Sequence, residues 1–120
     1  MHRLATALSI LLSVAAAHAA TDLTGIVVDA NSLPIAAAHV YVYRAHPKSG
    51  VSAVCLSCYR DCGKHVQVDA KGSFVLKNLD PTLLFDVLAV ADGYEPAFAK
   101  RVDPISGPVS IKLSPRSAAD

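Results

Sequence analysis

The chain has 120 residues, of which 52% are hydrophobic and 18% are charged. This length provides one small domain with a modest core. Disordered chains contain too little apolar surface to offset the entropy lost on ordering. The hydrophobic content of this chain therefore excludes intrinsic disorder. The formal net charge of +1 is too small to hold a phosphate backbone, so we expect no nucleic-acid partner.

The N-terminus has the pattern of a secretory signal peptide. Arg3 supplies a positive charge, residues 4–17 are mostly apolar, and small residues follow. The apolar run is shorter than the ~20 residues that a membrane-spanning helix needs. We therefore expect residues 1–19 to be a helical signal peptide cleaved near Ala19/Ala20. The mature protein would be secreted or periplasmic, formally neutral, and without stable membrane insertion.

The remaining chain alternates apolar and polar residues with period two, and it lacks the 3.6-residue spacing of an amphipathic helix. The sequence predicts seven short strands at 25–29, 38–43, 65–68, 73–77, 84–91, 98–102 and 109–113. A hairpin turn is expected at 69–72, before the fourth strand. This spacing indicates an all-β, two-sheet sandwich over residues 21–114, with a flexible tail at 115–120.

The second predicted strand has two distinct faces. Its inward face would consist of Ala38, Val40 and Val42, and its outward face of His39, Tyr41 and Tyr43. The outward row is a possible ligand-contact surface for a sugar or a protein, and ordinary cross-strand packing is the alternative. Lys100 and Arg101 are interpreted as an exposed pair that protects an edge strand, and His46 as a solvated loop residue.

Several segments occur in a characteristic order: Gly25-Ile26-Val27-Val28-Asp29, Pro34-Ile35, Val68-Asp69-Ala70-Lys71-Gly72-Ser73-Phe74 and Gly93-Tyr94-Glu95-Pro96. In this order they resemble the carboxypeptidase regulatory-like domain over residues 24–113. The resemblance implies a seven-stranded, transthyretin-like Greek-key sandwich, which is also grouped with carbohydrate-binding-like folds. It further implies a non-catalytic extracellular binding or accessory module. Leu33 and Ala37 depart from the pattern, because the family usually has glycine there.

Common catalytic motifs are missing from the sequence. The single glutamate is Glu95, so no His-x-x-Glu or His-Glu-x-x-His zinc motif exists. There is no Gly-x-Ser-x-Gly elbow and no glycine-rich phosphate loop. The chain also lacks the C-terminal Tyr-Arg-Gly-Ser motif of transthyretin-like hydrolases. We therefore expect no enzymatic activity, and an extracellular or periplasmic protein or glycan as the partner.

The loop predicted at 45–64 contains all three cysteines. Cys55, Cys58, Cys62 and His65 form a C-x2-C-x3-C-x2-H array. Hairpin connections usually have about two to five residues, and loops as long as this one are often functional or separately stapled. The array is therefore the main candidate for chemistry in the sequence.

Three interpretations of the array remain open. A Cys55–Cys62 or Cys58–Cys62 disulfide would suit an oxidising compartment and stabilise the folded protein by roughly 2 kcal/mol. The third cysteine would then have no disulfide partner within the chain. A Zn or Cu(I) site would use all four side chains, although they come from one short segment. Thiol redox chemistry at Cys55 and Cys58 would lack the helix N-terminus that usually favours a thiolate. Apart from Zn or Cu, no cofactor is expected.

Overall fold

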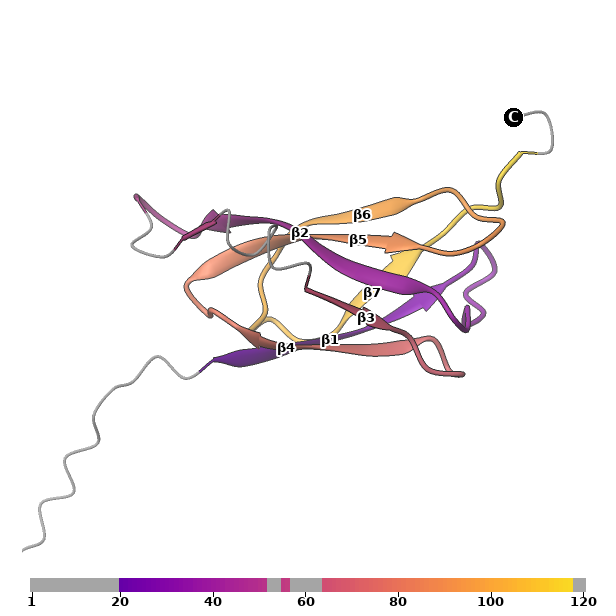
Figure 1. Ribbon diagram of the computed structural model, residues 1–120, viewed down its shortest axis with the longest axis horizontal. Coiled ribbons are helices and arrows are strands. Elements are labelled where there is room, and N and C mark those ends of the chain that lie inside the picture. Colours follow the sequence, from indigo (N-terminus) through magenta and orange to yellow (C-terminus); the bar gives the residue numbers. More distant parts are fainter. Residues whose placement is uncertain (1–19, 52–54, 57–63, 118–120) are drawn as a thin grey trace, which may run out of the picture.

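The computed structural model describes residues 20–51, 55–56 and 64–117. Two sheets lie face to face (Figure 1), one with the strand order β4-β1-β7 and the other with the order β3-β2-β5-β6. The prediction of an all-β fold with seven strands in two sheets is confirmed. The strands are β1 (Thr21–Val28), β2 (His39–Pro47), β3 (His65–Gln67), β4 (Ser73–Leu79), β5 (Leu83–Val90), β6 (Ala97–Val102) and β7 (Val109–Lys112).

The predicted signal peptide at 1–19 lies outside the described residues, as do Cys58, Cys62 and the last three residues of the predicted tail. The helical form and the cleavage of the signal peptide therefore stay predictions. Within the described ranges, no helix is long and apolar enough to cross a membrane.

The core fills the space between the inner faces of the two sheets. The predicted inward residues Val40 and Val42 of β2, and Ala38 just before it, are all buried, so the predicted inward face is confirmed. The predicted apolar strand at 84–91 corresponds to β5, which lies between β2 and β6 as expected for a central strand. The largest fully buried side chains are Phe85, Leu23, Leu76, Leu79, Leu83, Leu113, Val27, Val40 and Val87.

The predicted hairpin between β3 and β4 is wrong. Its turn does form, because the Gly72 N–H donates to the Asp69 carbonyl at 3.0 Å and Gly72 adopts a φ of 74°. However, the Val68 N–H before the turn bonds Ala38 of one sheet, while the Gly72 carbonyl accepts from Val27 of the other. The turn therefore carries the chain between the sheets, and β3 and β4 pair with β2 and β1 respectively.

Two edge strands contain bulges of the same construction. Lys77 and Asn78 on β4 lie opposite the single residue Asp22 on β1, and we call this the Asp22 bulge. Likewise, β6 places two residues, Lys100 and Arg101, opposite Asp86 on β5, which gives the Asp86 bulge. In each bulge the second residue has a positive φ, 61° for Asn78 and 52° for Arg101. Each aspartate accepts the backbone N–H of that residue, at 3.1 Å and 2.9 Å respectively.

Candidate ligand-binding site

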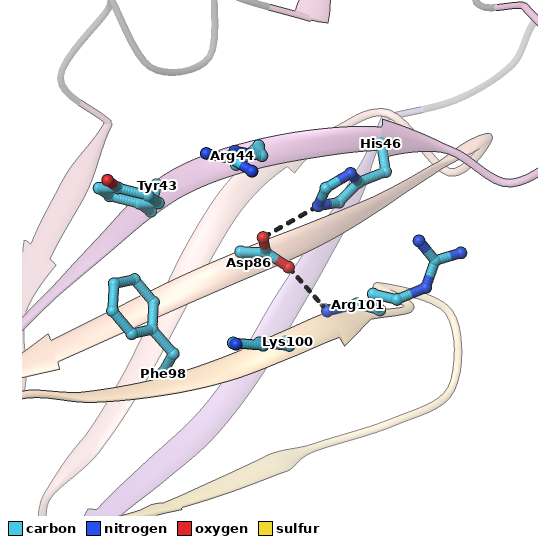
Figure 2. Close-up of a pocket in the computed structure, with 7 residues that line it drawn as sticks. All are labelled: Tyr43, Arg44, His46, Asp86, Phe98, Lys100 and Arg101. Atoms are coloured by element: carbon cyan, nitrogen blue, oxygen red, sulfur yellow. Dashed lines mark hydrogen bonds and ion pairs between the residues drawn. The ribbon is translucent and has the colours of Figure 1, made fainter.

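A cavity of about 470 Å³ lies on the outer face of the four-stranded sheet (Figure 2). Its volume falls in the usual range for sites that bind small ligands. Strands β2, β5 and β6 supply its walls, and β6 is an edge strand of the sheet. The lining residues are Tyr43, Arg44, His46, Asp86, Phe98, Lys100 and Arg101.

A third bulge, in β2, brings most of these side chains together. Val42 lies opposite Val87 and Arg44 lies opposite Asp86, which leaves Tyr43 as the extra residue. Such a bulge changes the phase of the alternation and redirects the side chains that follow. Ala45 is consequently buried, while Tyr43, Arg44 and His46 all line the cavity.

Asp86 lies at the centre of the cavity and is the only acidic residue that lines it. One carboxylate oxygen is 2.9 Å from His46 Nε2, and the other accepts the Arg101 N–H at 2.9 Å. Burial alone would raise the pKa of Asp86, since its side chain is only 13% exposed. The hydrogen bonds from Arg101 and His46, with the charges of His46 and Arg44, outweigh burial and hold the pKa below its ordinary value of 3.8.

Two aromatic rings form one end of the cavity. Tyr43 and Phe98 meet edge to face, with centroids 5.1 Å apart and an angle of 70° between their planes. This is a favourable arrangement for aromatic pairs. Phe98 is nevertheless 46% exposed, so this apolar residue stays available at the surface.

Three permanent cations surround the single carboxylate: Arg44, Lys100 and Arg101. The guanidinium carbon of Arg44 is 5.9 Å from the centre of the Tyr43 ring. Among the residues that the structure describes, the ion pairs are His46–Asp86 and Lys48–Asp103, and neither includes these three side chains. The cavity therefore combines an excess of positive charge with an apolar wall.

The predicted outward row of His39, Tyr41 and Tyr43 does not form one surface, because these residues take part in different contacts. Tyr41 stacks on His65 of β3, with centroids 5.1 Å apart and an interplanar angle of 19°. The His39 ring lies 6.4 Å from Tyr41 and lines a separate cavity of about 260 Å³. Tyr43, the extra residue of the β2 bulge, contributes instead to the cavity around Asp86.

The cysteine array is only partly described. Cys55 and His65 are described, and His65 lies in β3, whereas Cys58 and Cys62 fall outside the described residues. Within the part of the chain that is described, no three His, Cys, Asp or Glu side chains lie close enough to hold a metal ion. The disulfide, metal and redox interpretations therefore remain predictions.

Sequence reasoning missed Asp86 and Phe98 and interpreted His46 wrongly. His46 is not a loop residue, because β2 continues to Pro47. Lys100 and Arg101 do lie on an edge strand, as predicted, but they also line the cavity. One usable signal was present in the sequence, since Asp86 is the only charged residue within the predicted central strand at 84–91.

The sequence matches no protein-family description and no curated protein. Two solved structures share its architecture: shaft pilin spaA from Lactobacillus rhamnosus GG, with a TM-score of 0.51 and 16% identity, and 3-chlorocatechol 1,2-dioxygenase from Rhodococcus opacus 1CP, with 0.52 and 15%. Each alignment covers 82% of this chain, which spans 48% of the pilin and 60% of the dioxygenase. The fold is a β-sandwich. At these identities the similarity concerns the fold alone.

Proposed function

We propose that the chain is an exported, non-catalytic binding module that uses the cavity around Asp86. The observation that carries this proposal is the charge arrangement of the cavity, where three cations that make no ion pair among the described residues surround one carboxylate that already has a hydrogen bond on each oxygen. The ordered motifs that resemble a transthyretin-like, carboxypeptidase regulatory-like domain support it, as does the signal-peptide pattern. The fold alone does not decide, because one structural neighbour is a pilin and the other an enzyme.

The chemistry of the cavity also favours binding over catalysis. A general base needs a pKa near the working pH, and the pKa of Asp86 is held below its ordinary value. His46 and Asp86 are the residue types of the base and orienting residue in a catalytic triad, but Asp86 bonds His46 through Nε2, the nitrogen that faces the nucleophile in that triad. In addition, none of the seven described residues that line the cavity is Ser, Thr or Cys, the usual hydroxyl and thiol nucleophiles of such a triad.

We further propose that Cys55 is half of a disulfide that staples the loop after β2. A disulfide is expected to persist in an oxidising compartment. Intact mass and metal analysis of protein purified without oxygen or reductant tests this point. We expect a mass about 2 Da below the fully reduced value and no bound metal. Stoichiometric Zn or Cu that is lost in Cys55→Ser would overturn the disulfide and favour the metal-binding alternative.

Export is tested by expressing the full chain with its own N-terminus in a Gram-negative bacterium and fractionating the cells. We expect the protein in the periplasm or medium, with the mass of a chain that begins near Ala20. Full-length protein that remains in the cytoplasm would contradict export.

Binding is tested with the mature protein on a panel of immobilised extracellular polysaccharides, neutral and acidic. Phe98→Ala should abolish the binding that is found. Val75→Ala is the matched control, because Val75 is a 39% exposed apolar residue on the other sheet. If no polymer binds, or if both variants bind as the parent does, the proposed use of this cavity is wrong.

A further inference from the structure

We propose that the cavity around Asp86 binds carboxylate-bearing sugar units of an acidic polysaccharide. This inference rests on the proposed binding function and names its ligand class. It is carried by the juxtaposition of three cations, which make no ion pair within the described ranges, with a partly exposed aromatic wall.

The cations provide the first part of the argument. Arg44, Lys100 and Arg101 surround a carboxylate that His46 and a backbone N–H already engage. Figure 2 shows the three side chains spread around Asp86 rather than paired with it. Arginine presents a planar set of donors that matches a carboxylate in two-point geometry. The local excess of positive charge in a formally neutral mature chain therefore favours an anionic ligand with carboxylate groups.

The aromatic rings restrict the ligand further. A simple inorganic anion would gain nothing from the apolar wall that Tyr43 and the half-exposed Phe98 provide. A sugar ring has faces made of C–H groups, which can stack on an aromatic ring while its substituents reach polar groups at the side. An acidic peptide carries its carboxylates on flexible stems, separate from any ring that another of its side chains supplies. The combination therefore favours a uronate, which joins a ring face and a carboxylate in one unit.

The position of the cavity suits a polymer. It spans β2, β5 and β6, and β6 is the last strand of its sheet. A chain seated in the cavity can therefore leave across the sheet edge without crossing another strand of that sheet. The volume of about 470 Å³ is also within the range for a small ligand or a short segment of a larger one.

The test uses the mature protein and three probes in isothermal titration: oligogalacturonate, the same oligosaccharide after reduction of its carboxyl groups, and poly-glutamate of similar charge. We expect oligogalacturonate to bind and carboxyl reduction to weaken binding by about tenfold or more. Poly-glutamate should bind at least about tenfold more weakly than oligogalacturonate, because it has no ring face. Equal binding of the reduced sugar, or equal or tighter binding of poly-glutamate, would overturn the inference.

Variants separate this site from general charge attraction. Arg44→Gln should weaken oligogalacturonate binding by about tenfold. Lys77→Gln removes the same charge from the outer face of the other sheet and should change binding by less than about twofold. Thermal unfolding of each variant verifies that it is folded. Equal losses in the two variants would show nonspecific attraction and overturn the inference.

The two proposals fail in different ways. If a neutral polysaccharide binds and Phe98→Ala abolishes its binding, the binding module stands and the acidic-sugar inference is wrong. If none of the polymers binds, both are wrong.

Discussion

The Asp22 bulge and the Asp86 bulge are built alike but have different surroundings. In both, an aspartate on an internal strand accepts the N–H of a left-handed residue on an edge strand. Asp22 is exposed, and the hydrogen bond to Asn78 is the contact it makes among the described residues. Asp86 is mostly covered and also bonds His46. The hydrogen bond from the bulge to the aspartate is therefore a structural feature of the fold. Only the additional contacts of Asp86 indicate a function.

The positively charged side chains beside the two bulges also differ in the contacts that they make. At the Asp22 bulge, the Lys64 ammonium donates to the carbonyls of Lys77 and Asn78, so this cation is used within the chain. Lys77 of the Asp22 bulge also makes no ion pair among the described residues, but at the Asp86 bulge three such cations, Arg44, Lys100 and Arg101, line one cavity. This difference supports the proposed binding site on the outer face of the four-stranded sheet.

Removing each aspartate tests the difference most strongly. Asp86→Ala should lower the free energy of unfolding by about 2 kcal/mol, because His46 and the Arg101 N–H lose a partly buried acceptor. Asp22→Ala should cost less than about 1 kcal/mol, because water can replace an exposed acceptor. Urea unfolding of both variants provides the measurement. Equal losses would mean that the two bulges are energetically equivalent and would remove the basis of the comparison.

Sequence pattern was sufficient for the fold because period-two alternation reports burial, and burial of alternate residues defines strands in a sandwich. It failed at the bulges, where one extra residue changes the phase of that alternation. A regular strand would point Arg44 inward with Val42, whereas the bulge at Tyr43 places Arg44 in the cavity.

The partners of Asp86 were hidden for a second reason. His46 and Arg101 are 40 and 15 residues away from it in the chain, and only the strand order brings them together. The failed hairpin between β3 and β4 has a similar cause. A turn motif specifies a local reversal but not the sheet to which each flanking strand belongs.

The two tyrosines of β2 provide a smaller test of where function lies. Tyr41→Leu should lower the free energy of unfolding by about 1 kcal/mol through loss of its stack on His65, and leave oligogalacturonate binding unchanged. Tyr43→Leu should weaken that binding by removing part of the aromatic wall. Thermal unfolding and titration of both variants measure the two effects. If Tyr41→Leu weakened binding as much as Tyr43→Leu, the site would extend along the whole row.

The left-handed residues themselves differ between the bulges. Asparagine tolerates a positive φ well, whereas arginine does so less readily. Arg101→Asn should therefore stabilise the protein by about 0.5 kcal/mol and still weaken ligand binding. Asn78→Arg should destabilise it by a similar amount without affecting the ligand. Urea unfolding and titration distinguish these outcomes, and a destabilised Arg101→Asn variant would show that the arginine side chain contributes more to folding than its backbone strain removes.

The smallest expected effect is the pH dependence that Asp86 contributes. Its pKa in the folded protein is below the ordinary value of 3.8, so the unfolded chain binds a proton more readily over this range. The stabilisation is therefore complete above about pH 5 and is lost as the pH falls through the folded pKa. The difference in unfolding free energy between the parent and Asp86→Asn should shrink on acidification.

Asp103 offers a contrast within the same experiment, because the Lys48 ammonium, 2.8 Å away, also lowers the pKa of that carboxyl. Both side chains of this pair are about a third exposed, so salt should screen its contribution. The contribution of Asp86 should change less with salt, because its side chain is only 13% exposed and its bond to His46 is partly buried. A pH dependence that Asp86→Asn leaves intact, or that salt removes entirely, would show that the Asp86 bulge is as open to solvent as the Asp22 bulge.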